Sequence, residues 1–357
     1  MLRKIGVILA ISLMVAVSLL PLIPSAEAEM EIGSGIKKGY YISGLNQVEE
    51  EVYVQVDQIL TQEYNGNNPR DSIDFSIEFP SVIFEGEDAE ENAATYVKNT
   101  INKVLTIKYY SDLRAIWLWT YPVSHPDINV VVEDANLTSE TQSSTVKVPV
   151  SCSFTLSVDD RFKGNIPKTI NDVLNATYNS DSTDAIETIR GVYSMLSSVD
   201  VIDDEEGKIS TVYDALVDKK SSSAGIATAF RMMVTKSNNI GCVVVTGMSY
   251  ADSSEGKVHF WNQVEYNNKW YIVDATLSDC LMLGYDDTVV GEPVTSVLHN
   301  TSVQGLTYMS PPDVTRDSYE FPDERTFLDK YGSYFIVVAI VCLIVICLLM
   351  AVKQGLA

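Results

Sequence analysis

Three residues in the C-terminal half of the chain have side chains that together can carry out nucleophilic attack: Ser223, His259 and Asp274. A serine hydroxyl attacks a carbonyl carbon only when a base removes its proton, and histidine is the usual base. A carboxylate beside the histidine fixes its tautomer. These residue types therefore indicate an acyl-transfer or hydrolytic site for an amide substrate, provided that the fold brings them together.

Each of the three residues also has a simpler structural interpretation. Ser223 ends a run of three serines in front of an apolar helical pattern, where serine commonly caps a helix. A single histidine such as His259 is more often a polar residue whose hydrogen bonds are satisfied by its neighbours than a catalyst. Asp274 can cap the turn that follows it. Both interpretations stay open for each residue.

The segments around these residues predict a helix followed by an antiparallel sheet. The small and apolar spacing of residues 224–230 indicates a buried helix. Asn267 and Asn268 predict a turn between two strands, which puts His259 on one strand beside another that ends at Asp274. Buried strands are expected at residues 240–247, 258–264 and 269–276.

The order of these segments resembles the transglutaminase-like superfamily, which has a papain-like core. The resemblance covers roughly residues 184–283 and rests mainly on His-x-Trp-Asn at 259–262 and Lys-Trp-Tyr-x-Val-Asp-x-Thr at 269–276. Members typically carry a nucleophilic cysteine at the start of the central helix, within Gly-Val-Cys-x-Gly-Tyr-Ala-x-Ala-Phe. Ser223 stands at the cysteine position, and Ile226 replaces the aromatic residue. The residues that match the pattern are Gly225, Ala227, Ala229 and Phe230.

The resemblance implies a role for each candidate residue, and the serine is the departure. His259 is the expected base, Asp274 the residue that orients it, and Trp261 and Gly225 are expected to line the cleft. A cysteine beside a histidine can exist as a thiolate, because its free pKa of about 8.5 is easily lowered. A serine hydroxyl is not held as an anion in this way. A site shaped for a thiolate also holds a longer nucleophile, and a different oxyanion position, than a site shaped for serine.

Two functions from different classes follow. The first is a binding or scaffolding module, in which a transglutaminase-like cleft without its thiol recognises a peptide, a glycopeptide or a cell-envelope polymer. The second is an enzyme in which Ser223, His259 and Asp274 form a working triad for acyl transfer or hydrolysis. The serine at position 223 favours the first, a catalytically impaired cleft.

Both ends of the chain have the composition of membrane-targeting segments. A basic start, an apolar run and a small-x-small sequence ending at Ala28 predict a secretory signal peptide over residues 1–28. The uncharged run 334–352 predicts a transmembrane helix, and Lys353 after it favours a cytoplasmic C-terminus. We therefore expect a single-pass protein of the cell membrane, anchored by its C-terminal helix, with an extracytoplasmic ectodomain.

The ectodomain is expected to have an α+β fold. Its main part would be a papain-like or transglutaminase-like core, with a central helix packed on an antiparallel sheet, and a smaller α+β domain would precede that core. The expected parts are a flexible lead-in at 29–46, an N-terminal α+β domain at 47–165, a transglutaminase-like domain at 166–304, a stalk at 305–333 and a cytoplasmic tail at 353–357.

Composition limits the partners. The chain has 48 acidic and 25 basic residues, a net charge of −23, so nucleic acid and anionic lipid headgroups are poor partners. There is no glycine-rich phosphate loop, and the three histidines are far apart in the sequence, so we expect no cofactor and no metal. Three ectodomain cysteines, Cys152, Cys242 and Cys280, allow at most one internal disulfide.

Overall fold

The protein is described by a computed structural model that covers the chain in separate stretches. Residues up to Ser318 belong to one compact unit, and residues from Tyr319 onward to a second. The first unit contains all three candidate site residues. The described residues are 39–65, 71–80, 83–112, 115, 126–132, 135–137, 144–147, 150–158, 172–173, 175–177, 184–203, 210–238, 240–251, 254–300, 309–322 and 340.

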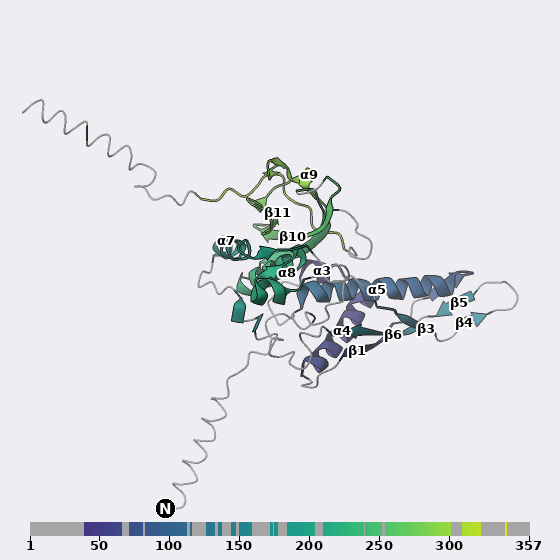
Figure 1. The fold of residues 1–357 in the computed structure, drawn as a ribbon. Helices are drawn as coiled ribbons and strands as arrows, with labels where there is room; N and C mark the ends of the chain where they lie inside the picture. Colours follow the sequence, from purple (N-terminus) through teal and green to yellow (C-terminus); the bar gives the residue numbers. More distant parts are fainter. Residues whose placement is uncertain are drawn as a thin grey trace, which may run out of the picture. The chain divides into compact units, whose positions relative to one another are not determined.

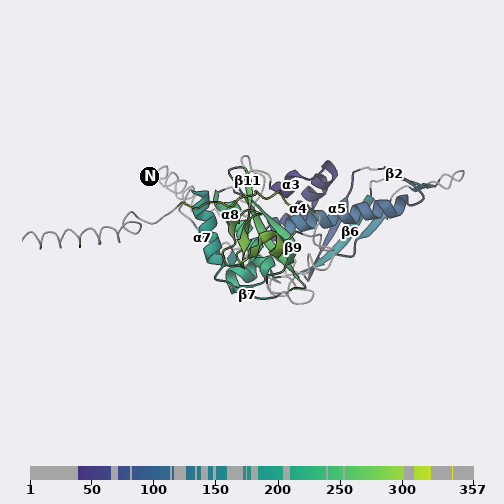
Figure 2. The same cartoon turned by 90° about the horizontal axis from the view of Figure 1, so that it is seen from above.

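A five-stranded antiparallel sheet organises the C-terminal half of the first unit (Figures 1 and 2). Its strand order is β12-β11-β10-β9-β15, so β10 lies in the middle. Asn267 and Asn268 have φ values of 53° and 59° in the tight turn between β10 and β11, a conformation that asparagine tolerates well. The strands are β9 (Gly241–Ser249), β10 (Lys257–Tyr266), β11 (Lys269–Val273), β12 (Leu281–Leu283) and β15 (Leu298–His299).

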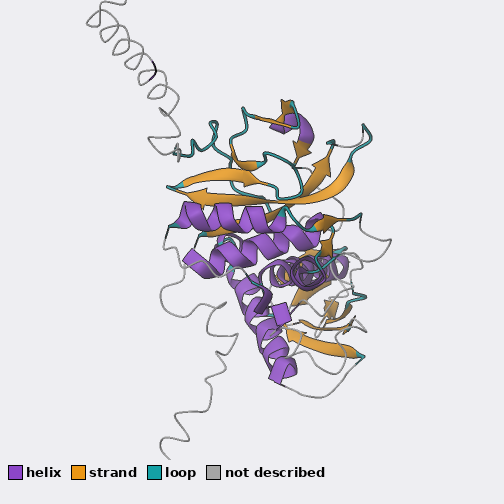
Figure 3. Ribbon diagram, turned by 60° about the vertical axis from the view of Figure 1, so that its left-hand side comes forward, coloured by secondary structure: helices purple, strands orange, loops and turns teal. Residues whose placement is uncertain are grey.

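Both faces of this sheet are buried. Helix α8 (Ser223–Asn238) packs on one face, where the Asn262 side-chain amide donates to the carbonyl oxygens of Ala227, at 2.9 Å, and Val243, at 3.3 Å. Figure 3 shows helices stacked along one side of the large sheet. Buried apolar residues of the sheet and of the segments that follow it form one hydrophobic cluster: Val243, Val245, Trp261, Ile272, Cys280, Leu283, Val289, Val294, Val297 and Leu298.

Helix α7 (Ala185–Leu196) packs against α8. Its N-cap is Asp184, whose carboxylate accepts from the Ile186 amide at 2.9 Å. The buried apolar residues recur every three or four positions: Ile186, Ile189, Val192 and Leu196. The apolar spacing of the sequence therefore forms the buried face of α7.

The described residues of the N-terminal half include the helices α4 and α5 and two three-stranded sheets. Helix α5 contacts α8 at one end and β2 at the other (Figures 1 and 2). Ile73, Phe75 and Ile77 alternate along the sequence and form the buried face of β1. The elements are α4 (Gln47–Asn65), β1 (Ser72–Glu78), β2 (Ile83–Gly86), α5 (Ala89–Ser111), β3 (Asn129–Val132), β4 (Ala135–Leu137), β5 (Ser144–Lys147) and β6 (Val150–Ser157), in sheets ordered β1-β6-β3 and β2-β5-β4.

Short elements connect these parts. A two-stranded parallel pair, β7 with β8, precedes α8, and a π-helical turn η2 lies just before β8. Helix α9 packs on β13, β14 and β15. The bounds are α3 (Tyr40–Ser43), β7 (Asp200–Val201), η2 (Asp214–Asp218), β8 (Lys220–Ser221), β13 (Thr288–Val289), β14 (Glu292–Pro293) and α9 (Val294–Val297).

Part of the segment expected to be a stalk, residues 305–333, is hydrogen-bonded to the five-stranded sheet and to the residues that follow β12. Thr315 N donates to the Trp270 carbonyl at 2.8 Å, and Tyr285 N donates to the Thr315 carbonyl at 3.0 Å. Ser318 Oγ accepts from Gly284 N at 2.8 Å. Residues 314–318 therefore run along the edge of the sheet, and the domain limits inferred from the sequence stay a prediction.

The predicted membrane segments fall almost wholly outside the described residues. This holds for the signal peptide at 1–28 and for the run 334–352 apart from Ile340. Within the described ranges, no helix is long and apolar enough to cross a membrane. Membrane anchoring therefore stays a prediction.

Gly247 on β9 leaves no room for a side chain. A Cβ there would come within 2.2 Å of the His299 carbonyl oxygen and 2.5 Å of the Trp261 ring. We therefore expect Gly247→Ala to lower the free energy of unfolding by about 1–3 kcal/mol, the usual cost of overpacking. The matched control is Gly44→Ala, because Gly44 has a φ of −91° and the nearest atom lies at 3.6 Å. Urea unfolding measures both, and equal stability of the two variants would contradict this packing.

Candidate functional site

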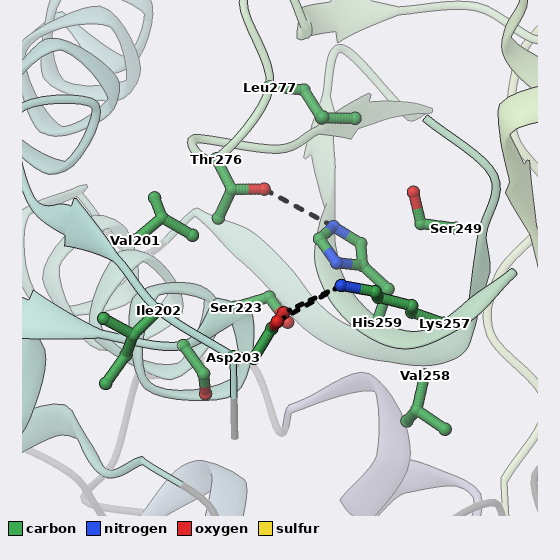
Figure 4. A pocket seen from close by; sticks show the side chains of 11 residues that line it. Val201, Ile202, Asp203, Ser223, Ser249, Lys257, Val258, His259, Thr276 and Leu277 are labelled. Carbon is green, nitrogen blue, oxygen red and sulfur yellow. Dashed lines mark hydrogen bonds and ion pairs between the residues drawn. The ribbon is translucent and has the colours of Figure 1, made fainter. Parts of the chain in front are cut away.

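Ser223 and His259 line one cavity of about 120 Å³ (Figure 4). Asp274 is not among the lining residues. Asp274 is 1% exposed and makes contact with His259. The structure thus brings the three predicted residues together, from the start of α8, from β10 and from the end of β11. The other lining residues are Val201, Ile202, Asp203, Ser222, Ser249, Lys257, Val258, Thr276 and Leu277.

Ser223 is the first residue of α8, and its side chain is bonded to the sheet. The Ser222 carbonyl accepts the first helical hydrogen bond, from Ile226 N at 3.2 Å, so the cap position belongs to Ser222. The Ser223 hydroxyl oxygen instead accepts from the Phe260 amide at 3.3 Å. The capping role considered for Ser223 is therefore wrong, because its hydroxyl faces β10.

The His259–Asp274 pair follows from the register of β10 and β11. Asn262 lies opposite Val273, so the residue after Val273 comes beside the first half of β10. His259 Nε2 lies 2.6 Å from Asp274 Oδ2. This pairing is the arrangement in which a carboxylate fixes an imidazole tautomer.

Asp274 also caps the turn that follows it, so both of its predicted roles are present at once. Its Oδ1 accepts from Thr276 N at 2.9 Å and from Thr276 Oγ1 at 2.7 Å. Thr276 Oγ1 lies 3.4 Å from His259 Nε2. A buried carboxylate needs such partners, and here one oxygen serves the turn while the other serves the histidine.

The orientation of the imidazole differs from that in Ser-His-Asp enzymes. There Nε2 takes the serine proton, and the Nδ1 proton bonds the aspartate. Here Nε2 faces Asp274, and Figure 4 shows the Nδ1 edge of His259 turned toward Ser223. The histidine is thus reversed relative to a serine triad.

Trp261 and Gly225, which were expected to line the cleft, lie in the packed interior. Trp261 is 2% exposed and belongs to the apolar cluster of the sheet, with its ring centroid 6.3 Å from that of His259. A Cβ on Gly225 would come within 2.2 Å of Ser221 Oγ and 2.4 Å of the Thr211 carbonyl oxygen. Both residues therefore position the site from behind, and neither is among the lining residues.

Sequence reasoning missed several residues at this site. Thr276 is one, although Asp-Ala-Thr is a recognisable pattern for a turn in which aspartate accepts from the amide two residues on. Lys257 and Asp203 form an ion pair at 3.2 Å, and both are strongly exposed. Such an exposed pair joins segments that are distant in sequence, so no local pattern reveals it.

The cysteines do not replace the missing thiol. Cys152, Cys242 and Cys280 are all free and buried. Burial raises the pKa of Cys152 and of Cys242 to about 12, and burial with the charge of Asp274 raises that of Cys280. A thiol with a raised pKa is a poor nucleophile at neutral pH. Among the described residues, no group of three or more potential ligands is placed to hold a metal ion.

Comparison with known proteins gives a partial structural likeness. No protein-family model and no curated protein matches the chain. A solved structure of a Cytophaga hutchinsonii protein, provisionally described as a cysteine protease, matches with TM-score 0.20 and 12% identity, over 44% of this chain and 66% of that one. A structure described as a TGase matches with TM-score 0.19 and 15% identity, over 41% and 44%. The matches span less than two thirds of either structure, and at these TM-scores they carry no argument about activity.

The Asp274 carboxylate should contribute to stability as well as to the site. Asp274→Ala leaves the Thr276 amide and the His259 ring without their buried acceptor, so we expect a loss of roughly 2–4 kcal/mol in the free energy of unfolding. The matched control is Asp313→Ala, an exposed aspartate that should change stability by less than about 0.5 kcal/mol. Urea unfolding compares the two variants, and an Asp274→Ala protein as stable as the control would show that these bonds are absent.

Proposed function

We propose that this chain is a membrane-anchored, extracytoplasmic protein whose transglutaminase-like cleft binds a peptide or a peptide-containing cell-envelope polymer and is catalytically impaired. The observation that carries this proposal is a preformed His259–Asp274 pair, at 2.6 Å, beside a serine at the nucleophile position. The site keeps the base and its carboxylate and lacks the thiol that the resemblance calls for.

The physical chemistry of Ser223 supports the impaired cleft. A serine cannot be held as a preformed anion by a neighbouring imidazole, whereas a cysteine can. The Phe260 amide already donates to the Ser223 oxygen at 3.3 Å, so one of its lone pairs is engaged.

The wall of the cavity supports a peptide-like ligand. At β7, the amides of Asp200 and Ile202 donate to carbonyl oxygens of the segment 219–221, at 3.0 and 3.1 Å. The main-chain N–H and C=O groups of Val201 therefore point away from β8. No described strand pairs with that outer edge of β7. An extended peptide can add to such an edge through main-chain hydrogen bonds. Val201 and Val258 are 51% and 46% exposed at the cavity, which suits an apolar side chain on the ligand.

The sequence alone supports the membrane part of this proposal. The uncharged run 334–352 is long enough to cross the roughly 30 Å hydrocarbon layer as a helix. Lys353 after it favours a cytoplasmic tail, and the apolar N-terminal segment favours export. The cleft would then face outward from the cell membrane.

A second candidate function is an active amide acyl-transferase or hydrolase that uses Ser223, His259 and Asp274. The observation that favours it is that His259 and Ser223 share the cavity at the N-terminus of α8. The first amides of a helix have no intrahelical acceptor and can stabilise an oxyanion. In this mechanism Nδ1 of His259 would take the serine proton during attack on the amide carbon.

Substitution of Ser223 separates the two functions. We expect wild-type protein to be inert toward a fluorophosphonate and toward an amine donor with a glutamine peptide. Ser223→Cys should gain iodoacetamide reactivity at pH 7, at least about tenfold faster than the same variant with His259→Gln, because the imidazole lowers the thiol pKa. Residue-level mass spectrometry measures the labelling.

The matched control for this experiment is Ser223→Ala. Fluorophosphonate labelling and turnover in wild type that vanish in Ser223→Ala would overturn the impaired cleft in favour of the serine enzyme. A Ser223→Cys thiol that reacts equally with and without His259 would mean that the pair does not serve position 223.

A further inference from the structure

A second and larger cavity, of about 410 Å³, lies away from the Ser223 site. Its walls come from α3, from the C-terminal half of α8, and from the end of the sheet where β9 begins and β10 turns into β11. It shares no lining residue with the cavity of Ser223 and His259. The lining residues that matter are Tyr40, Arg231, Thr235, Gly241, Glu265 and Trp270.

Arg231 places a positive charge on the wall of this cavity. Its Nη1 donates to the Tyr110 carbonyl at 3.2 Å, and a guanidinium has five N–H donors. Asp112 acts on Arg231 through its charge, but its ion pair is with Lys108, at 3.4 Å. No carboxylate in the described part of the chain lies within ion-pair distance of Arg231. Burial lowers the pKa of the Arg231 guanidinium, so an anion bound there would offset a desolvation cost.

Thr235 adds a hydroxyl next to this charge. It lies four residues after Arg231 on α8, so the two side chains share one face of the helix. Its Oγ1 is buried and, within the described residues, has no hydrogen-bond partner. A buried hydroxyl without a partner is uncommon and costs free energy. The guanidinium and the hydroxyl are together suited to the two oxygens of a carboxylate.

Two aromatic rings form part of the remaining wall. The rings of Tyr40 and Trp270 meet edge to face, with centroids 5.4 Å apart. Gly241 keeps the cavity open, because a Cβ there would come 2.5 Å from Glu265 Oε2 and 3.4 Å from the Trp270 ring. The carboxylate of Glu265 on the same wall opposes a bound anion, and it opposes a ligand with several negative charges more strongly than one with a single charge.

We propose that this cavity binds a small organic monocarboxylate with a flat apolar body. Its carboxylate bonds Arg231 and Thr235, and its body packs on Tyr40 and Trp270. A free aromatic acid and the C-terminal residue of a peptide offer the same chemistry. The volume is in the usual range for a small-molecule site, and the lining combines aromatic rings with a charged group and a hydroxyl that can orient a ligand. The site is independent of the proposed cleft, because it uses none of its residues.

Ligand-observed NMR on the full-length protein in detergent tests this site. The probes are phenylacetate and its uncharged isostere phenylacetamide, and a short phenylalanine-ended peptide with a free or an amidated C-terminus. We expect each free acid to bind at least about tenfold more tightly than its amide, which corresponds to one charge-assisted hydrogen bond. Binding of phenylacetate alone would assign the site to free acids, and binding of both acids would extend it to peptide ends.

Variants locate the binding. Arg231→Gln should abolish the preference for the acid, and Thr235→Val, which keeps the side-chain shape, should weaken acid binding several-fold while circular dichroism stays unchanged. The matched control, Arg190→Gln on α7, should bind as wild type does. Equal binding of acid and amide by the wild type, no binding of either, or a preference that survives both Arg231→Gln and Thr235→Val would each overturn the proposal.

Discussion

The buried carboxylate of Asp274 is the constraint on which the geometry of the candidate site depends. At 1% exposure it must have its hydrogen bonds satisfied within the protein. It does so by holding His259 through one oxygen and Thr276 through the other, while its own amide donates to the Cys280 carbonyl at 2.9 Å. One side chain thus fixes the imidazole, the end of β11 and the following turn. The position of the histidine is therefore set whatever residue occupies position 223.

The position of Ser223 is set by a separate set of contacts. Asn262 ties α8 to the sheet through the Ala227 carbonyl, and the absence of a Cβ at Gly225 lets the chain around Thr211 pack against the first turn of α8. These contacts hold the helix start beside β10, and the Ser223 hydroxyl adds the hydrogen bond that it accepts from the Phe260 amide. A thiol and a hydroxyl would occupy the same place here, but only a thiol gives a nucleophile that an imidazole can keep ionised. The proposed function, binding without efficient turnover, is consistent with such a scaffold.

The sequence predicts the parts of this site that depend on local pattern. Strand periodicity and the Asn267-Asn268 turn are enough to bring His259 and Asp274 together, and the helix start places Ser223. The sequence does not predict contacts set by tertiary packing. Residues 314–318 have the composition of a linker, yet their main chain bonds to the sheet, because backbone pairing at a sheet edge does not depend on side chains. The burial of Trp261 and the cavity beside Arg231 likewise result from tertiary packing. The resemblance to the transglutaminase-like superfamily stays a hypothesis.

The tautomer of His259 tests the central claim most directly. Long-range ¹⁵N–¹H NMR distinguishes the two ring nitrogens, and His259 is one of only three histidines, so a His259→Gln variant assigns its signals. At a pH where the ring is neutral, we expect a proton on Nε2, donated to Asp274, and an unprotonated Nδ1. A proton on Nδ1 and a bare Nε2 would contradict it, because Asp274 would then not hold the histidine in the observed orientation.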